Sequence, residues 1–250
     1  MTRESESAMH TLFSRLTTGL FVLGVAGGTA VYAAPLPCQT SSLQSYVASG
    51  PCSVGNLVFS SFNVIANPSG APALGAENIT VTPTSGEYTQ SLDFRFQTTA
   101  IGSPFGSSFE QIFTYLVNPL GTFTNAGISL SGSQATDDGV VLSNQFLCQG
   151  GTLSGDGSSC QGAGSFFNQA VVAIDPDDPT LLMSSLSLDS NGAVLFVRNE
   201  IAVDGGQAGS ASGGTLTNSF TAVPEPAGMT GVGTLLVAGL AYYRRRRLGQ

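Results

Sequence analysis

The groups that could do chemistry in this chain are carboxylates, because bases are scarce. The sequence has one histidine, His10, and all eight of its basic residues are arginines. Beyond residue 33 there is no histidine or lysine, so the many serines lack the base that Ser-His-Asp, Cys-His and Ser-Lys pairs require. A glycosidase-like pair of carboxylates is the catalytic chemistry that remains. Its candidates are Asp93, Glu110, Asp137, Asp138, Asp189 and Glu200.

No spacing in the sequence places two of these carboxylates at a working separation. Tryptophan, the usual side chain for stacking on sugars, is absent. We therefore expect a protein that is not an enzyme, with no catalytic residue and no cofactor.

The densest acidic cluster, Asp175, Asp177 and Asp178, could donate oxygens to Ca²⁺. The alternative is a solvated turn, because Pro176 and Pro179 explain the geometry and aspartate is a common turn residue. EF-hand spacing is missing, so the cluster is a weak calcium candidate and we expect no metal site.

Four cysteines form two local groups, Cys38 with Cys52 and Cys148 with Cys160. Each pair brackets a polar loop that contains glycine and serine. Three connectivities are possible, and we expect the local one, in which each short loop contributes roughly 3 kcal/mol. Zinc sites use closely spaced cysteines with histidine partners, and neither is present.

The elements that carry these residues read as short strands between turns. Strict alternation in Leu92–Gln97 predicts a strand with one buried face. Asn191-Gly192 predicts a hairpin between its flanking strands, because both residues tolerate positive φ. Further strands are predicted at Leu57–Ile65, Ile79–Val81, Ile112–Val117, Ile128–Ser133, Val140–Leu147, Phe166–Ile174, Leu181–Leu188, Ala193–Val203 and Thr215–Phe220.

About ten short strands with regular turns indicate an all-β fold, an antiparallel sandwich or a barrel. The aromatic residues at strand positions are expected in its core: Phe59, Phe62, Phe94, Phe96, Phe113 and Tyr115.

Residues 1–33 are typical of a secretory signal peptide that engages the Sec translocon. An apolar run over residues 16–31 follows Arg15, and Val31-Tyr32-Ala33 offers small residues for cleavage before Ala34. Acidic residues near Met1 are unusual in such a leader, so translation from Met9 is an alternative start. An N-terminal anchor helix is the other interpretation.

The last residues combine three parts in order: Val223-Pro224-Glu225-Pro226, the uncharged run Ala227–Tyr243, and Arg244, Arg245, Arg246 and Arg247. The run has 17 residues, about 26 Å as a helix against roughly 30 Å of hydrocarbon. This length suits a temporary transmembrane helix, and the four arginines would hold the C-terminus in the cytoplasm.

This tail resembles the PEP-CTERM sorting signal of bacterial surface proteins. The resemblance implies that exosortase, a membrane cysteine transpeptidase, recognises Pro224, Glu225 and Pro226 and removes the segment beyond. An inner-membrane intermediate would then give a protein of the cell surface or extracellular matrix. An ordinary single-pass anchor behind a proline-rich linker is the alternative. Weaker similarity to such ectodomains in 50–55 and 201–206 implies no assigned activity.

The chain thus divides into residues 1–33, an ectodomain at 34–222, and the sorting signal at 223–250. The ectodomain holds two arginines and thirteen acidic residues, a formal charge of −11. So few cations predict no nucleic-acid binding, and anionic lipid would repel the domain.

We expect an exported, non-enzymatic surface or exopolysaccharide-matrix protein, with acidic exopolysaccharide as a candidate partner. The alternatives are a carbohydrate- or calcium-binding lectin-like module, and a permanently membrane-anchored envelope protein.

Overall fold

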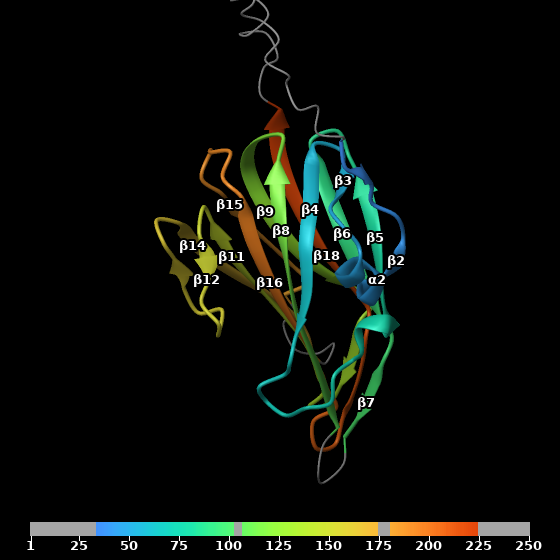
Figure 1. The fold of residues 1–250 in the computed structure, drawn as a ribbon. Helices are drawn as coiled ribbons and strands as arrows, with labels where there is room; N and C mark the ends of the chain where they lie inside the picture. The colour runs from blue at the N-terminus through green and yellow to red at the C-terminus, as the bar shows by residue number, and fades with distance from the viewer. Residues whose placement is uncertain (1–33, 103–106, 175–180, 225–250) are drawn as a thin grey trace, which may run out of the picture. The chain divides into compact units, whose positions relative to one another are not determined.

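The computed structural model describes residues 34–102, 107–174 and 181–224. This part of the chain is almost entirely strand, and its two large sheets lie face to face (Figure 1). The seven-stranded sheet has the order β1-β3-β4-β8-β16-β11-β14, and the six-stranded sheet has the order β15-β9-β18-β6-β5-β2. The predicted all-β fold is confirmed, and the architecture is a β-sandwich.

The seven-stranded sheet comprises β1 (Leu36–Pro37), β3 (Cys52–Val54), β4 (Leu57–Ile65), β8 (Ser108–Pro119), β16 (Leu195–Asp204), β11 (Val140–Gln149) and β14 (Ser165–Ala173). The six-stranded sheet comprises β15 (Met183–Ser187), β9 (Gly121–Ser131), β18 (Thr215–Pro224), β6 (Thr89–Phe96), β5 (Ile79–Ser85) and β2 (Ser41–Ser42). Two small sheets are formed by β10 (Gln134–Thr136), β17 (Ser210–Ser212) and β7 (Thr99–Ile101), and by β12 (Thr152–Leu153) and β13 (Cys160–Gln161). The described helices are α2 (Leu43–Ala48) and the 3₁₀ turn η1 (Ala76–Asn78).

All ten predicted strand ranges fall on strands of the structure, and β4 matches its prediction at both ends. The other eight described strands have two or three residues each, too short to show a period. Strand pairing is antiparallel except between β1 and β3, which run parallel.

The space between the two sheets is filled by aromatic side chains, as predicted. Phe59, Phe62, Phe94, Phe96, Phe113 and Tyr115 are all buried. Rings from opposite sheets meet there, with centroids 4.6 Å apart for Phe94 and Phe113 and 6.2 Å apart for Phe59 and Phe220. Such pairs favour this facing arrangement of the sheets beyond simple apolar burial.

A β-bulge in β4 reverses which side chains of the strand's second half face the core. Ser61 has φ 55°, and the register to β8 shifts between Ser60 and Asn63. Without the shift, strict alternation would put Ser61 in the core and Phe62 outside. The bulge brings Phe62 into the core, where its ring stacks on Tyr115 at 5.1 Å.

The predicted hairpin at Asn191-Gly192 is wrong. β15 pairs with β9 in one sheet and β16 pairs with β8 and β11 in the other, so the segment between them crosses from sheet to sheet. Neither residue has the positive φ that a type I′ turn needs. The Gln149 side chain holds the crossing instead, donating to Asp189 O at 2.9 Å and to Asn191 Oδ1 at 2.8 Å.

Both expected disulfides are present, Cys38–Cys52 and Cys148–Cys160. The two terminal segments, 1–33 and 225–250, lie outside the described residues, as do the predicted helices in them. Within the described ranges, no helix is both long enough and apolar enough to cross a membrane.

Candidate functional site

The outer face of the seven-stranded sheet carries a mixed row of polar and aromatic side chains. Five strands contribute one residue each, in register: Asn168, Phe146, Arg198, Thr114 and Asn63. The residues on either side of each in its strand point the other way, toward the core. The row therefore lies on the face turned away from the other sheet.

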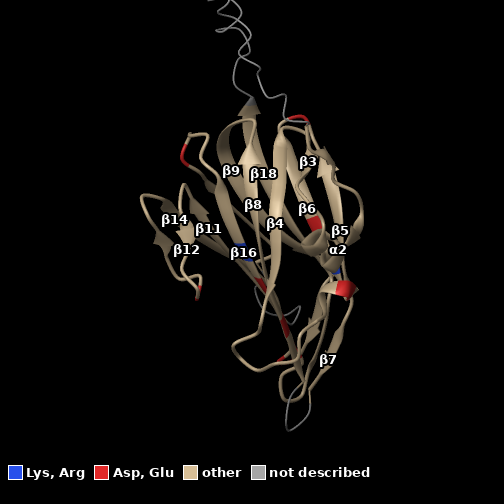
Figure 2. Ribbon diagram, in the orientation of Figure 1, with Lys and Arg blue, Asp and Glu red and all other residues tan. Residues whose placement is uncertain are grey.

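Arg198 is the buried cation of this row, with its side chain 5% exposed. Its Nη2 donates to Glu200 Oε1 at 2.5 Å, and its guanidinium carbon lies 5.8 Å from the ring centre of Phe146. Figure 2 shows this single basic position on β16, with acidic positions further along the same strand. Ion pair and ring contact together compensate for the burial of the charge.

The disulfide loop between Cys148 and Cys160 covers Arg198. Gly155 accepts a hydrogen bond from Arg198 Nη1 at 3.3 Å. A Cβ at Gly157 would lie 2.5 Å from the same Nη1, and its φ is +75°, so only glycine lets the loop come this close. Within the loop, hydrogen bonds from Ser154 and Ser158 lower the pKa of Asp156 to about 2.

Of the six carboxylates considered for catalysis, Glu110 and Glu200 lie closest in the strand register. They are on neighbouring strands and the same outer face, one diagonal step apart. Each is already engaged, because Ser69 Oγ donates to Glu110 at 2.6 Å and Arg198 is paired with Glu200.

The other four candidates lie on three separate parts of the fold. Asp93 on β6 accepts from Thr217 Oγ1 at 2.8 Å. Asp189, on the crossing between β15 and β16, accepts from the hydroxyl of Ser165 on β14. Asp137 and Asp138 form the predicted turn before β11.

Asp138 is an exposed acid that binds three backbone N–H groups of another turn. Its carboxylate accepts from the backbone N–H groups of Gln207 at 2.7 Å, Ala208 at 3.0 Å and Gly209 at 2.7 Å. These bonds, that from Gln207 foremost, hold the pKa of Asp138 below its usual value. The carboxylate fastens the turn before β17 to the turn before β11.

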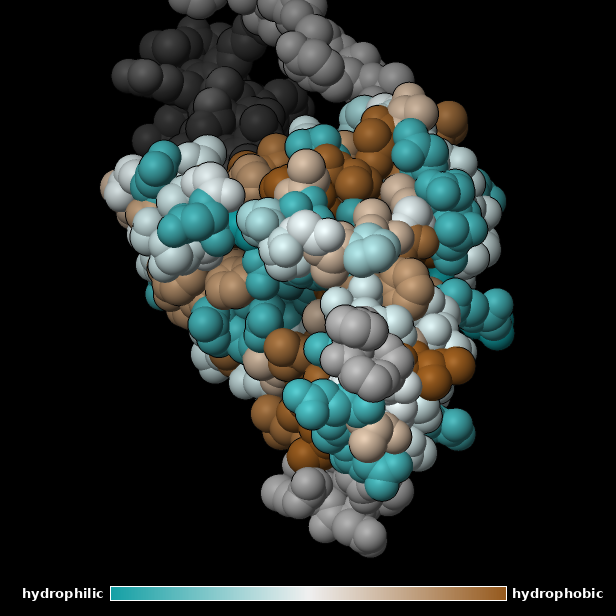
Figure 3. Space-filling model, turned by 90° about the horizontal axis from the view of Figure 1, so that it is seen from below, coloured by the Kyte–Doolittle hydropathy of each residue, from teal (hydrophilic) through white to brown (hydrophobic). Residues whose placement is uncertain are grey.

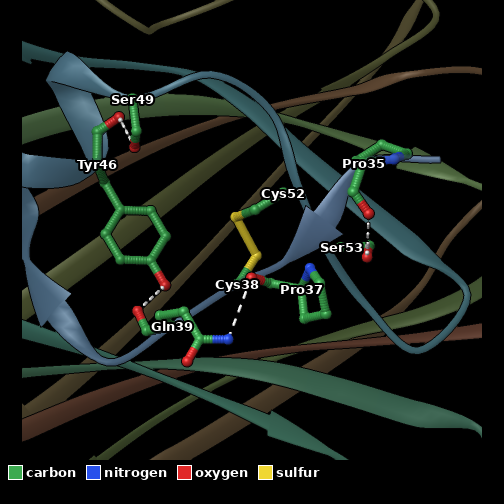
Figure 4. Close-up of a disulfide and its surroundings, with 8 residues drawn as sticks. All are labelled: Pro35, Pro37, Cys38, Gln39, Tyr46, Ser49, Cys52 and Ser53. Atoms are coloured by element: carbon green, nitrogen blue, oxygen red, sulfur yellow. Dashed lines mark hydrogen bonds between the residues drawn. A yellow bond between two sulfur atoms is a disulfide. The ribbon is translucent and has the colours of Figure 1, made fainter. Parts of the chain in front are cut away.

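A surface hollow of about 420 Å³ lies beside the Cys38–Cys52 disulfide. Figure 4 shows the Tyr46 ring beside this disulfide, with its hydroxyl directed at the backbone of Gln39. That hydroxyl donates to Gln39 O at 2.7 Å, and burial raises the pKa of Tyr46 to about 12. Among the residues drawn, Ser49 Oγ donates to Tyr46 O at 3.2 Å and Gln39 Nε2 donates to Pro37 O at 3.3 Å, so these side chains bond to nearby backbone.

The calcium candidates Asp175, Asp177 and Asp178 lie outside the described residues. Inside the described ranges, no three His, Cys, Asp or Glu side chains gather in a way that could hold a metal ion.

Comparisons with known proteins add little to this geometry. No protein-family model and no curated protein matches the chain. Among solved structures, TmCBM61 in complex with β-1,4-galactotriose aligns at 10% identity over 63% of this chain and 86% of its own, with a TM-score of 0.27. The CBM22-1 xylan-binding domain of Paenibacillus barcinonensis Xyn10C aligns at 10% identity over 76% and 99%, with a TM-score of 0.20. At these TM-scores the likeness supports no conclusion about this protein.

The sequence did not single out the row around Arg198. A lone cation in the middle of an apolar strand, flanked by Val197 and Asn199, is the signal that could have drawn attention to it. Its partners Phe146 and Gly155 come from elements that only the fold brings together.

Proposed function

We propose that this chain is an exported, non-catalytic protein of a bacterial cell surface or extracellular matrix, addressed there by its C-terminal tail. The observation that carries the proposal is the pair of disulfides, Cys38–Cys52 and Cys148–Cys160. Disulfides form and persist in oxidising compartments outside the cytosol. A signal peptide at residues 1–33 supplies the route out, through the Sec translocon.

The tail supplies the address. Pro224-Glu225-Pro226 is the recognition motif for an exosortase, the run 227–243 is a temporary transmembrane helix, and the arginines 244–247 hold it until cleavage. The anchored form is an inner-membrane intermediate, and cleavage releases the sandwich to the surface or matrix.

Hydrogen bonding at the acidic side chains supports a non-catalytic role. Glu110, Glu200, Asp93, Asp138 and Asp189 each serve a structural contact. A carboxylate in such a contact positions backbone or side chain and is not held free for proton transfer to a ligand.

Substitution in the motif tests the address. In a producing cell with its exosortase, a Glu225→Ala chain should stay in the membrane fraction with the arginines attached. The matched control is Glu87→Ala, which removes an exposed acid from the β5–β6 turn and should be processed normally. Equal processing of both chains contradicts the proposed role of the motif.

A carbohydrate-binding module is the second candidate, favoured by the outer face of the seven-stranded sheet. Phe166 there is 37% exposed and lies two positions from the exposed Asn168, which together offer a ring face and an amide. Calorimetry with neutral and acidic polysaccharides, with and without Ca²⁺, should give heat that a Phe166→Ala change reduces. The matched control is Tyr88→Ala, and an absence of heat with every polysaccharide removes this candidate.

A further inference from the structure

Exposed apolar side chains gather at the end of the sandwich where the chain leaves β18. They are Tyr88 in the β5–β6 turn, Leu120 between β8 and β9, Val194 just before β16, and Val223 near the end of β18. Their exposed fractions are 52%, 63%, 38% and 46%. We call these four residues the exit patch.

Hydrogen bonds and strand register bring the exit patch together from distant parts of the sequence. Leu195, next to Val194, pairs with Val117 near the end of β8, so Val194 lies at the same end as Leu120. Ala222 N donates to Tyr88 O at 3.2 Å, which joins the β5–β6 turn to the end of β18. Asn56 connects the other side, since its carbonyl accepts from Leu120 N at 2.8 Å and its side chain donates to Ala222 O at 2.9 Å. Figure 1 shows these turns at the same end as the arrowhead of β18.

The sequence after β18 indicates that the exit patch faces a lipid bilayer. Only Glu225 and Pro226 separate Pro224 from the uncharged run 227–243. Three residue steps span at most roughly 10 Å of extended chain. A bilayer that takes up the run must therefore lie within headgroup distance of the exit patch.

We propose that the exit patch rests on the lipid bilayer surface while the tail is inserted. This inference builds on the tail being a transmembrane segment, as proposed above. Tyrosine and aliphatic side chains are suited to the boundary between headgroups and acyl chains, roughly 5–10 Å deep. This contact places the C-terminal end of β18 at the membrane surface and holds Pro224 at the level of the lipid headgroups.

Apolar burial drives this contact, and charge does not. Glu87 adjoins Tyr88 in its turn, and Asp189 is exposed on the crossing before Val194 (Figure 2). Anionic lipid would repel both acids, so the contact forms best on zwitterionic lipid. The opposite end of the sandwich, seen in Figure 3, presents apolar groups broken up by polar ones.

Tryptophan fluorescence can test the contact without background, because the chain has no tryptophan. Leu120→Trp and Tyr88→Trp chains are made in a bacterial host without exosortase, purified from the membrane fraction and placed in phosphatidylcholine vesicles. The matched control is Ile101→Trp, since Ile101 is 65% exposed on β7, at the other end of the sandwich (Figure 1).

With brominated acyl chains, the Leu120→Trp and Tyr88→Trp chains should lose about half of their emission or more, because this depth reaches the upper acyl chain. The Ile101→Trp chain should keep its emission. If all three chains float with the vesicles and are quenched equally little, the exit patch does not touch lipid and the inference is wrong. If the chains do not enter the membrane fraction at all, the proposed transmembrane tail fails, and this inference fails with it.

Discussion

Tyr115 and Asn218 join the two sheets through a hydrogen bond in the middle of the core. Asn218 Nδ2 donates to Tyr115 Oη at 2.8 Å and to Asn199 Oδ1 at 2.9 Å. Both asparagines are fully buried, and burial raises the pKa of Tyr115 well above its usual value. Buried polar groups of this kind cost free energy unless they are bonded, so they select one alignment of the sheets.

Removing the Tyr115 hydroxyl should weaken the fold. A Tyr115→Phe change leaves the amide of Asn218 with one partner fewer, at a cost of about 1–2 kcal/mol in the free energy of unfolding. Urea unfolding measures this loss. Tyr88→Phe, at an exposed tyrosine, is the control and should change stability by less than about 0.5 kcal/mol. Equal effects in the two variants would show that the buried bond is not stabilising.

Asp138 should make the stability of the turn before β17 depend on pH in the acidic range. Its folded pKa lies below the usual 3.8 because of backbone hydrogen bonds, that from Gln207 foremost. A lowered pKa means that the stabilisation is present above the unfolded value and is lost as pH falls through the folded value.

Amide exchange at residues 207–209 should therefore quicken as the pH is lowered below the usual aspartate value of 3.8, beyond the change in intrinsic exchange rates. An Asp138→Asn chain should show fast exchange at these amides at every pH in that range. Protection that is the same in both chains would mean that the carboxylate does not fasten the turn.

At the scale of elements, the Cys148–Cys160 loop depends on a side chain from a strand beneath it. Arg198 reaches Gly155 in the loop and Glu200 on its own strand. The disulfide closes the loop, and the hydrogen bond from Arg198 fixes the position of the loop over the sheet.

An Arg198→Met change should cost roughly 2 kcal/mol, because it removes bonds made by a charged group and leaves Glu200 without its cation. Hydrogen exchange in residues 154–159 should rise in the same variant. Arg95→Met, at an exposed arginine, is the matched control and should leave both quantities unchanged. A loop that exchanges equally slowly in both variants is held by its disulfide alone.

The strands themselves could be predicted, because alternation in segments such as Leu92–Gln97 reflects one buried face. Which strands pair could not be predicted from local pattern. Asn191-Gly192 has the residues of a hairpin turn, yet Gln149, forty residues earlier, bonds to the crossing segment and helps to lead it to the other sheet. Likewise, the bulge at Ser61 was not predictable from β4 alone. It becomes visible only in the pairing with β8, where the register shift lets Phe62 enter the core.

The same limit applies to the candidate site. The local disulfide pairs were predictable from spacing, and the dispersal of the carboxylates agrees with the lack of any motif. The row around Arg198 was not predictable, because Asn168, Phe146 and Thr114 come together only through the register of four strands.

At the scale of the whole molecule, the proposal gives the two terminal segments a role in export and sorting, and the structure describes a sandwich with two disulfides in the sequence between them. The last described residue of β18 is Pro224, which is also the first residue of the proposed recognition motif.

Intact mass spectrometry of the protein released by its producing cell tests this account most directly. If both terminal segments are removed as proposed, the released chain begins at Ala34, ends near Pro226 and is lighter by four hydrogens for its two disulfides. A released chain that still carries Arg244–Arg247 would contradict it.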